Sequence, residues 1–456
     1  MTDEMRNTLI YTPKSSIQPE NKANVEAFCE KYKAFMNASK TEREATAYAK
    51  AAAEEAGFRP FDRKQALKTG DKVYYVNRDK SIVLAVIGKS AIENGANIVV
   101  AHVDSPRLDI KQRPLYEDGG LAYFKTHYYG GIKKYQWPAM PLALHGVVVK
   151  KNGEKVTVSL GEELDEPAFY ISDLMPHIAK DQVDKPLATA ISGEGLNVIV
   201  GSEPCDDEKD ALRLGVLSAL YEKYGITEGD LLTAELSVVP AGKARDVGFD
   251  RGMISAYGHD DRICAYPSMV ALFEETAPER TCICIFADKE EVGSYGVTGM
   301  SSAAYRNFLS DLCELGGASF SAFCENSICL SADVGGAYDP CYCDAYDPKN
   351  SCYVNKGVVV TKYTGARGKS GTSDASAELL HKLCAVLDRE GAVWQTGEYG
   401  KVDQGGAGTV ATEIALLNID VVDVGVPMLS MHAPYELASK WDIYQMYKTA
   451  KAFFTM

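Results

Sequence analysis

The sequence has few of the features that mark disordered, exported or membrane-spanning chains. Its 456 residues contain no long single-residue tract, and no uncharged apolar run reaches the roughly 18 residues that would suggest a membrane span. The opening segment has neither a basic head followed by an apolar run nor a small-residue cleavage site. Disordered and collagen-like chains are excluded by this composition. We therefore predict a cytoplasmic globular protein with no membrane partner.

Positive charge is also scarce. Lysine and arginine number 48 against 63 aspartates and glutamates, which gives a net charge of -15. This balance opposes binding to polyanions, so we predict no nucleic-acid partner. With 46% apolar residues the chain can build a large core, and its length suggests two or three domains or one large domain with an insertion.

The cysteines give little sign of disulfides. Most of the 12 lie singly in apolar runs, where a reduced thiol behaves as a small hydrophobic group. Cys341, Cys343 and Cys352 form a cluster, but they lack paired C-x-x-C spacing and a fourth obvious ligand. We therefore expect buried or loose thiols there rather than a structural zinc site.

Two kinds of predicted secondary structure follow one another along the chain. Residues 20–57 are predicted to form two helices, the second opened by a capping box at Thr41-x-x-Glu44. Strands are predicted at residues 72–77, 81–88, 96–101, 281–287, 328–332 and 421–426, and further helices at 301–314, 373–387 and from Pro434 onward. Between about 108 and 245 the pattern changes to many short β segments, with a hairpin around Asn152-Gly153.

This order predicts an α/β protein. We expect a three-layer α/β/α catalytic domain with a mostly parallel sheet, formed by residues 1–107 and 246–456. Residues 108–245 are predicted to form an inserted β-rich domain.

Acids and histidines follow several of the predicted strands. His102 and Asp104 follow residues 96–101, Glu290 and Glu291 follow 281–287, and Asp333 follows 328–332. His432 lies a few residues beyond the last strand. Ligands of an open α/β sheet bind at the carboxyl ends of its strands, so we expect these side chains to converge.

A metal centre explains this set of residues. Asp260-Asp261-Arg262 stands before a helical pattern and adds a carboxylate. The five candidate ligands are then His102, Asp260, Glu291, Asp333 and His432. If one carboxylate bridges two Zn²⁺ ions, each ion receives a histidine, a terminal carboxylate and the bridge, and a shared water takes the fourth position. Three carboxylates against two divalent ions favour hydroxide over neutral water.

Two further carboxylates fit supporting roles. Asp104 lies two residues after His102 and can accept the second ring N–H of that histidine, which fixes its tautomer. Glu290 stands beside Glu291 and can take a proton from the bridging water and pass it to a leaving amine.

Four motifs resemble, in order and spacing, the signatures of the aspartyl aminopeptidase family of dinuclear metallo-aminopeptidases: His102-Val103-Asp104-Ser105-Pro106, Glu290-Glu291-Val292-Gly293-Ser294, Ser331-Ala332-Asp333 and Ser430-Met431-His432. The resemblance implies that the five candidates are ligands with Asp260 bridging, that Glu290 is the general base and that Asp104 orients His102. It also implies an inserted domain that serves oligomerisation, in a tetrahedral dodecamer with an internal chamber.

The chain departs from the family pattern near Asp260. The family commonly has Arg-Leu-Asp-Asn before the helix, so either Asp260 or Asp261 could bridge, and we favour Asp260. Members that prefer acidic N-terminal residues carry a base near the penultimate helix, for which Arg367 and Lys369 are the possible equivalents here. His177 resembles a family histidine that reaches a neighbouring subunit's active site and helps to hold the oxyanion.

We therefore predict a metallo-aminopeptidase that removes N-terminal residues, with a preference for Asp or Glu, from peptides. Its cofactors would be two divalent metal ions, Zn²⁺ first, with Mn²⁺ or Co²⁺ suiting the carboxylate-rich ligands almost as well. One alternative is a metal-dependent amidohydrolase of small N-acyl compounds. Another is a non-catalytic metal-binding scaffold, against which the presence of both Glu290 and Asp104 argues.

Overall fold

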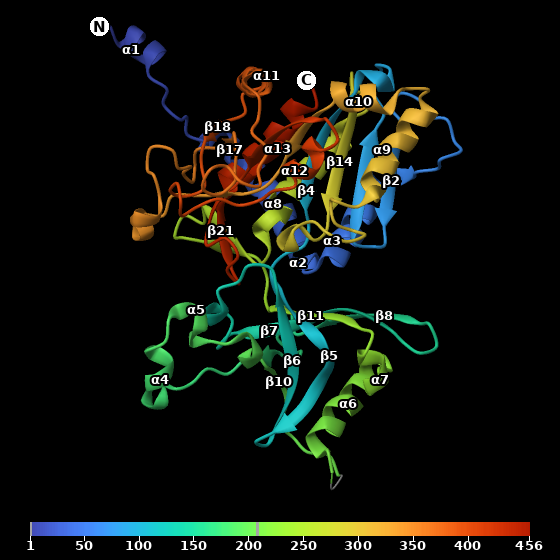
Figure 1. Cartoon of the computed structure of the whole chain (residues 1–456), viewed down its shortest axis with the longest axis vertical. Helices are drawn as coiled ribbons and strands as arrows, with labels where there is room; N and C mark the ends of the chain where they lie inside the picture. The colour runs from blue at the N-terminus through green and yellow to red at the C-terminus, as the bar shows by residue number, and fades with distance from the viewer. Residues whose placement is uncertain (1, 207–208) are drawn as a thin grey trace.

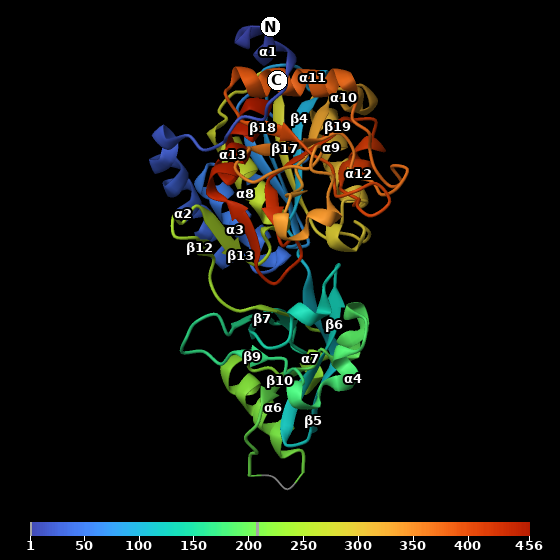
Figure 2. The same ribbon diagram turned by 90° about the vertical axis from the view of Figure 1, so that its left-hand side faces the viewer.

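The computed structural model describes residues 2–206 and 209–456 as two bodies joined at a narrow waist (Figure 1). The larger, upper body contains both ends of the chain, whereas the lower body is formed by its middle part. A view from the side shows the same division (Figure 2). Segments from the beginning and the end of the chain therefore share one body.

The upper body is built on a sheet of nine strands within the described residues. In spatial order they are β1 (Arg59–Pro60), β2 (Lys72–Asn77), β3 (Ser81–Val86), β14 (Thr281–Ala287), β4 (Ala96–His102), β15 (Ile328–Ser331), β19 (Asp420–Gly425), β17 (Val358–Thr361) and β18 (Trp394–Thr396). The central strands β14, β4, β15 and β19 run parallel to one another, while β3 and β17 flank them in the antiparallel sense. The predicted mostly parallel sheet is confirmed.

Helices cover both faces of this sheet. One face packs against α2 (Lys22–Ala38), α3 (Glu42–Glu55), α8 (His259–Glu274), α11 (Ala377–Arg389) and α13 (Lys440–Phe453). The other packs against α9 (Ala303–Leu315), α10 (Phe320–Asn326) and α12 (Ala411–Ala415). Alternate residues of one strand enter the two cores: Leu84 lies in the first, and Val83 and Ala85 in the second. The three-layer architecture follows from this alternation.

Helix spans agree with the sequence patterns at the N-terminal side. Thr41 Oγ1 accepts a hydrogen bond from the Glu44 amide, and the Thr41 amide donates one to the Glu44 carboxylate at 2.9 Å. This capping box satisfies two amides that a helix start leaves unpaired. The helix α1 (Asp3–Leu9) precedes these elements and stands away from the upper body (Figure 1). None of the helices in the described part of the chain combines the length and the apolar character that crossing a bilayer requires.

The lower body contains a second, closed sheet. In spatial order its strands are β11 (Glu235–Pro240), β5 (Arg107–Asp118), β6 (Leu121–Tyr129), β10 (Val198–Gly201), β9 (Phe169–Tyr170), β7 (Pro141–Val149) and β8 (Lys155–Leu160), and β11 also pairs with β7. In the described part of the chain it is accompanied by the helices α4 (Lys180–Val183), α5 (Leu187–Ala190), α6 (Ala211–Tyr224) and α7 (Glu228–Leu231). Val148 pairs with Val156 across the hairpin expected at Asn152-Gly153. The proposed division at residues 108 and 245 stays a prediction, and this sheet runs from Arg107 to Pro240.

A third, small sheet lies in the upper body and corrects the predicted start of the last helix. Its strands are β12 (Arg245–Val247), β13 (Met253–Ala256), β21 (Glu436–Ser439), β20 (Pro427–Leu429) and β16 (Gly335–Gly336). The helix predicted from Pro434 begins only at Lys440, because β21 pairs with β13 and Ser439 caps the helix from its side chain. The helix predicted from Ser373 likewise begins at Ala377, capped by Ser376.

A buried histidine joins the two bodies. His145, on β7, is only 2% exposed, and its ring nitrogens lie 2.8 Å from Glu44 Oε1 and 3.1 Å from Glu162 Oε1. Lys40 approaches the same Glu162 oxygen at 3.4 Å. Burial lowers the pKa of His145, but the two carboxylates outweigh burial and raise it to about 9. The protonated ring therefore bridges helix α3 and the second sheet.

The interaction of His145 with Glu44 and Glu162 predicts that the protein loses stability at high pH. The folded pKa of His145 lies above the ordinary value of 6.5, so its contribution is complete below that pH and is lost as the pH rises through about 9. The full contribution corresponds to roughly 3 kcal/mol. Urea unfolding measured below pH 6.5 and above pH 9 gives the drop in the free energy of unfolding between these conditions. This drop should be smaller in His145→Gln than in the wild type. The exposed His381, changed to Gln, is the control and should leave it unaltered; equal pH dependence in all three proteins would contradict the expectation.

Candidate metal centre

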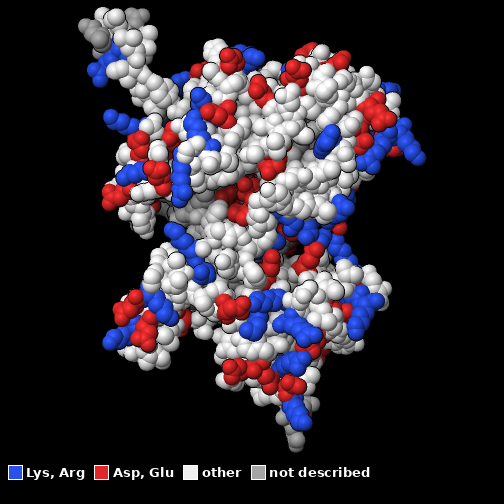
Figure 3. Space-filling model, in the orientation of Figure 1, with Lys and Arg blue, Asp and Glu red and all other residues white. Residues whose placement is uncertain are grey.

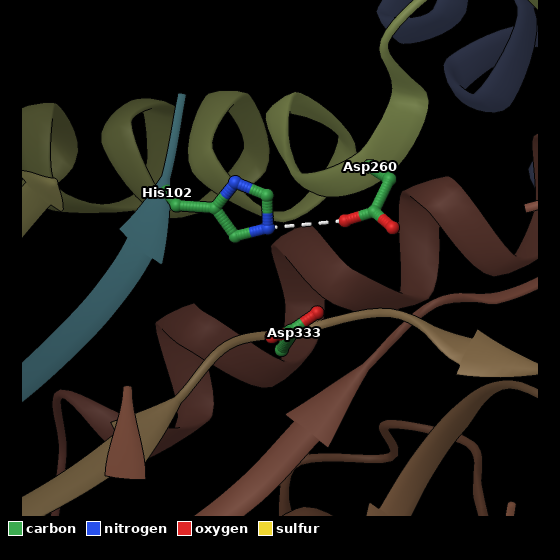
Figure 4. Close-up of side chains that lie close together, drawn as sticks. All are labelled: His102, Asp260 and Asp333. Atoms are coloured by element: carbon green, nitrogen blue, oxygen red, sulfur yellow. Dashed lines mark ion pairs between the residues drawn. The ribbon is translucent and has the colours of Figure 1, made fainter. Parts of the chain in front are cut away.

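The carboxyl end of β4 presents His102 toward two carboxylates. Its Nε2 lies 3.1 Å from Asp260 Oδ1, and Asp333, on the segment after β15, lies close to both side chains (Figure 4). The opposite nitrogen, Nδ1, lies 3.1 Å from the carbonyl oxygen of Asp104 and 3.4 Å from its Oδ1. A proton on Nδ1 is held by these oxygens, which leaves the Nε2 lone pair free to face a cation.

Asp260 lies between two histidines. Its Oδ1 faces His102, and its Oδ2 lies 3.3 Å from His432 Nε2. The backbone around it is fixed, since Ser105 Oγ donates to the Asp260 carbonyl at 2.9 Å and the Asp260 amide donates to Glu436 Oε2 at 3.1 Å. Asp260 is therefore the central residue of the cluster.

The structure brings together all five residues that the sequence nominated as ligands. His102, Asp260 and Asp333 offer donor atoms within 4.8 Å of one another, and so do Asp260, Glu291 and His432. The two groups share Asp260. Asp261, the other candidate for the shared position, belongs to neither group. Each group supplies one histidine, one carboxylate of its own and the shared carboxylate.

The cluster carries crowded, buried negative charge. Burial raises the pKa of Glu291 and Asp333, and the neighbouring Asp260 raises both further. Burial acts on Asp260 in the same direction, but hydrogen bonds from the two histidines outweigh it and hold the pKa of Asp260 below its ordinary value. Glu291 Oε1 is buried and accepts no hydrogen bond within the described residues. Acidic side chains are also visible in a hollow of the upper body just above the waist (Figure 3). This nitrogen and oxygen donor set fits divalent cations, which would neutralise the charge.

Glu290 stands at the edge of the cluster without joining either group. Its Oε2 lies 3.9 Å from His102 Nε2, and its side chain keeps 17% of its surface exposed. Burial raises the pKa of Glu290 to about 7, with Asp104 and Asp260 adding to the shift and His102 opposing it. A carboxyl group with that pKa exchanges protons readily near neutral pH.

Asp104 organises both the histidine and the glutamate pair. Asp104 is fully buried. Besides its contacts with His102, its carboxylate accepts hydrogen bonds from the backbone amides of Glu290 at 3.2 Å and Glu291 at 3.3 Å. The turn after β14 is thus tied to the residue that orients His102.

Three residues that surround the cluster were not predicted from the sequence. Glu436 is 1% exposed and accepts the amides of Asp260 at 3.1 Å and His432 at 2.7 Å. Tyr129 donates from its hydroxyl to Asp104 Oδ2 at 2.7 Å, and the Gly131 carbonyl lies 2.8 Å from His432 Nδ1. Only the Gly130-Gly131 pair carries a signal in the sequence, because adjacent glycines mark a close backbone approach.

The predicted substrate-binding residues belong to neither group of candidate ligands. Arg367 and Lys369 are exposed and line a cavity of about 400 Å³ together with Lys401 and Tyr399. The Tyr399 hydroxyl donates to the carbonyl of Val334, the neighbour of Asp333, so the cavity adjoins the cluster. His177 is exposed on the lower body, and within one chain the described structure does not bring it to the cluster.

The three cysteines of the cluster differ in exposure. Cys341 and Cys343 are exposed on a short helical turn, whereas Cys352 is buried and its thiol lies 3.4 Å from the Gly336 carbonyl. The candidate metal groups found within the described residues contain no cysteine. The expectation of buried or loose thiols agrees with these positions.

Known proteins share this sequence and fold. Residues 35–454 match the family described as "Aminopeptidase I zinc metalloprotease (M18)". A Clostridium acetobutylicum protein named "Probable M18 family aminopeptidase 1" is 47% identical over 437 residues, which is 94% of each chain. The crystal structure of an M18 aminopeptidase from Thermotoga maritima is similar at a TM-score of 0.94 and 41% identity, over 98% of this chain and 99% of that chain. For aminopeptidase I of Clostridium acetobutylicum the TM-score is 0.91 at 43% identity, with the same shares of the chains covered.

Proposed function

The chain belongs to the M18 family of zinc aminopeptidases, and from this premise we propose that the five converging side chains hold two divalent metal ions beside Glu290 as general base. As a member of that family, it is a metal-dependent aminopeptidase, which hydrolyses peptides from the N-terminal end. One observation carries the proposal for the site: two three-residue groups of metal-ligating type share Asp260.

Each ion is assigned its own residues. His102 and Asp333 would hold one, Glu291 and His432 the other, and Asp260 both. When bound, divalent ions supply Lewis acidity toward the scissile carbonyl and lower the pKa of the attacking water. Zn²⁺ is the ion that the family description names.

The remaining steps belong to the side chains of the protein. Glu290 would take a proton from the attacking water and return it to the leaving amine, since it is the carboxylate beside the cluster that belongs to neither group of candidate ligands. Asp104 keeps His102 in one tautomer and holds the Glu290-Glu291 turn through two amides. These two residues distinguish a catalytic site from a scaffold that only stores metal.

We assign the acidic preference to the cavity beside the cluster. Arg367, Lys369 and Lys401 line it together with Glu398, so a carboxylate side chain of the substrate would find three cations against one anion there. Lys369 is already paired with Asp374 at 2.8 Å and lies 3.8 Å from the centre of the Tyr363 ring. An acidic substrate side chain would compete with Asp374 for this lysine, while Arg367 is the more available of the two.

A peptide panel tests both the activity and the preference. We expect metal-dependent release of the N-terminal residue from peptides that start with Asp, Glu, Leu or Lys, with the highest kcat/KM for Asp or Glu. Changing Arg367 and Lys369 together to Ala should lower kcat/KM for the acidic peptides about tenfold or more, since charge-assisted contacts are lost, and should leave the Leu peptide nearly unchanged.

The control for the double variant is Lys382→Ala, which removes one exposed lysine from helix α11. Fastest release from Leu or Lys peptides would reject the acidic pocket and keep the metal site. Cleavage of N-acetylated amino acids without release from free-amine peptides would instead support the amidohydrolase alternative.

We further propose that the chain works as a homo-oligomer, in a tetrahedral dodecamer. A structure of the mApe1 dodecamer of S. cerevisiae has the same fold at 18% identity and a TM-score of 0.77. His177 supports the proposal, because it is exposed on the lower body among exposed apolar side chains, which include Met175 and Ile178. In an oligomer this histidine would reach a neighbouring active site and help to hold the oxyanion.

A cytoplasmic location and the absence of nucleic-acid or membrane partners belong to the same proposal. The described cysteines are all free, which fits a reducing compartment. The net charge of -15 opposes binding to polyanions.

A further inference from the structure

The segment at the end of β6 enters the metal cluster from the lower body. It consists of Tyr129, the last residue of the strand, and of Gly130 and Gly131, and we call it the Tyr-Gly-Gly turn. Each of its three residues approaches a different residue of the site: Tyr129 contacts Asp104, Gly130 lies against Glu291, and Gly131 contacts His432. The second sheet thus contributes to the site of its own chain.

Tyr129 holds Asp104. Its hydroxyl donates to Asp104 Oδ2 at 2.7 Å, on the side of the carboxylate away from His102, which lies 3.4 Å from Oδ1. The ring is fixed in turn, because the Arg107 guanidinium lies 4.1 Å from its centre and is anchored to Glu42 at 2.9 Å and Asp109 at 2.8 Å. Tyr129 therefore constrains the carboxylate that orients the first histidine.

The two glycines approach the other half of the cluster. A Cβ atom on Gly130 would lie 3.2 Å from Glu291 Oε2, and the φ angle of +76° at this residue favours glycine. The Gly131 carbonyl accepts from His432 Nδ1 at 2.8 Å, and a Cβ there would lie 3.3 Å from the same nitrogen. The turn passes so close that side chains at these two positions would press on the ligands.

We propose that the Tyr-Gly-Gly turn is a positioning element for both metal half-sites, with Tyr129 acting on His102 through Asp104 and Gly131 acting on His432 directly. The inference rests on the proposed metal centre. The hydrogen bond to each ring nitrogen keeps the opposite nitrogen free for the metal, and loss of such a partner typically weakens metal binding ten- to a hundredfold. The second sheet then serves the active site as well as assembly.

Cobalt titration of the metal-free protein tests the turn. We expect Tyr129→Phe, which keeps the ring on Arg107 and removes only the hydroxyl, to bind one of two Co²⁺ ions about ten- to a hundredfold more weakly and to change the visible Co²⁺ spectrum. Gly131→Ala should weaken the other ion, so that the double variant loses affinity for both. Tyr128→Phe is the matched control, because this 42% exposed neighbour lies on the same strand. The thermal midpoints of the two phenylalanine variants should equal that of the wild type.

The outcomes separate this inference from the proposed function. If wild type binds two ions and Tyr129→Phe binds both within twofold of it, the positioning role is overturned and the metal centre stands. If Tyr129→Phe weakens binding no more than Tyr128→Phe does, the role is overturned as well. If wild type itself binds no pair of ions, the proposed metal centre fails and this inference fails with it. Weakening of one ion by Tyr129→Phe, with wild-type stability, supports the role.

Discussion

Replacing Glu290 by glutamine is expected to leave two metal ions on the protein and to lower kcat by a factor of about 10² to 10⁴. Glutamine keeps the size of the side chain but neither takes a proton from the attacking water nor returns it to the leaving amine. The metal ions should remain, because Glu290 belongs to neither group of candidate ligands and lies 3.9 Å from His102 Nε2. Metal content by elemental analysis and steady-state hydrolysis of an Asp-initiated peptide measure the two effects together.

A matched control isolates the effect of the general base. Glu314→Gln makes the same chemical change at an exposed position of helix α9, and its kcat should equal that of the wild type. If Glu290→Gln kept wild-type kcat, another group would move the proton. If the variant lost metal as well as activity, Glu290 would be a ligand, and the division of labour with Glu291 would be wrong.

The sequence predicted the positions that regular structure controls. His102 is the last residue of β4, Asp333 and Glu291 lie a few residues beyond β15 and β14, and these adjacent parallel strands end at the same edge of the sheet. Any chain with that strand order brings such residues together, whatever its loops do. For this reason the three-layer fold and most of the candidate ligand set could be predicted without a structure.

The residues around the ligands depend on contacts that a linear pattern does not contain. Glu436 accepts the Asp260 amide from a strand that lies 176 residues further along the chain, and the strand itself was predicted as helix. Tyr129 reaches Asp104 from the second sheet. A buried carboxylate and a buried hydroxyl give no periodic signal, because their positions follow from how two sheets meet. The choice between Asp260 and Asp261 stayed open for the same reason, because it depends on tertiary contacts and not on the sequence pattern.

The second large effect is expected at Asp260, the residue that both groups share. Changing it to Asn keeps the shape of the side chain but removes its negative charge, and a neutral amide holds two cations poorly. Because Asp260 Oδ1 faces His102 and Oδ2 faces His432, the amide leaves one ion without its oxygen ligand and both ions without the shared negative charge. We expect metal content to fall from two ions per chain to one or none, and kcat/KM to fall by about 10³ or more. Equilibrium dialysis with Zn²⁺ and peptide hydrolysis measure these losses.

Asp261→Asn is the decisive comparison, since it makes the identical change one residue away. Asp261 is fully buried but lies outside both groups of candidate ligands. This variant should therefore keep two ions and most of the activity. If Asp261→Asn lost both ions while Asp260→Asn kept them, the shared position would belong to Asp261. If each variant lost only one ion, the two aspartates would serve separate sites and the shared carboxylate would have to be abandoned.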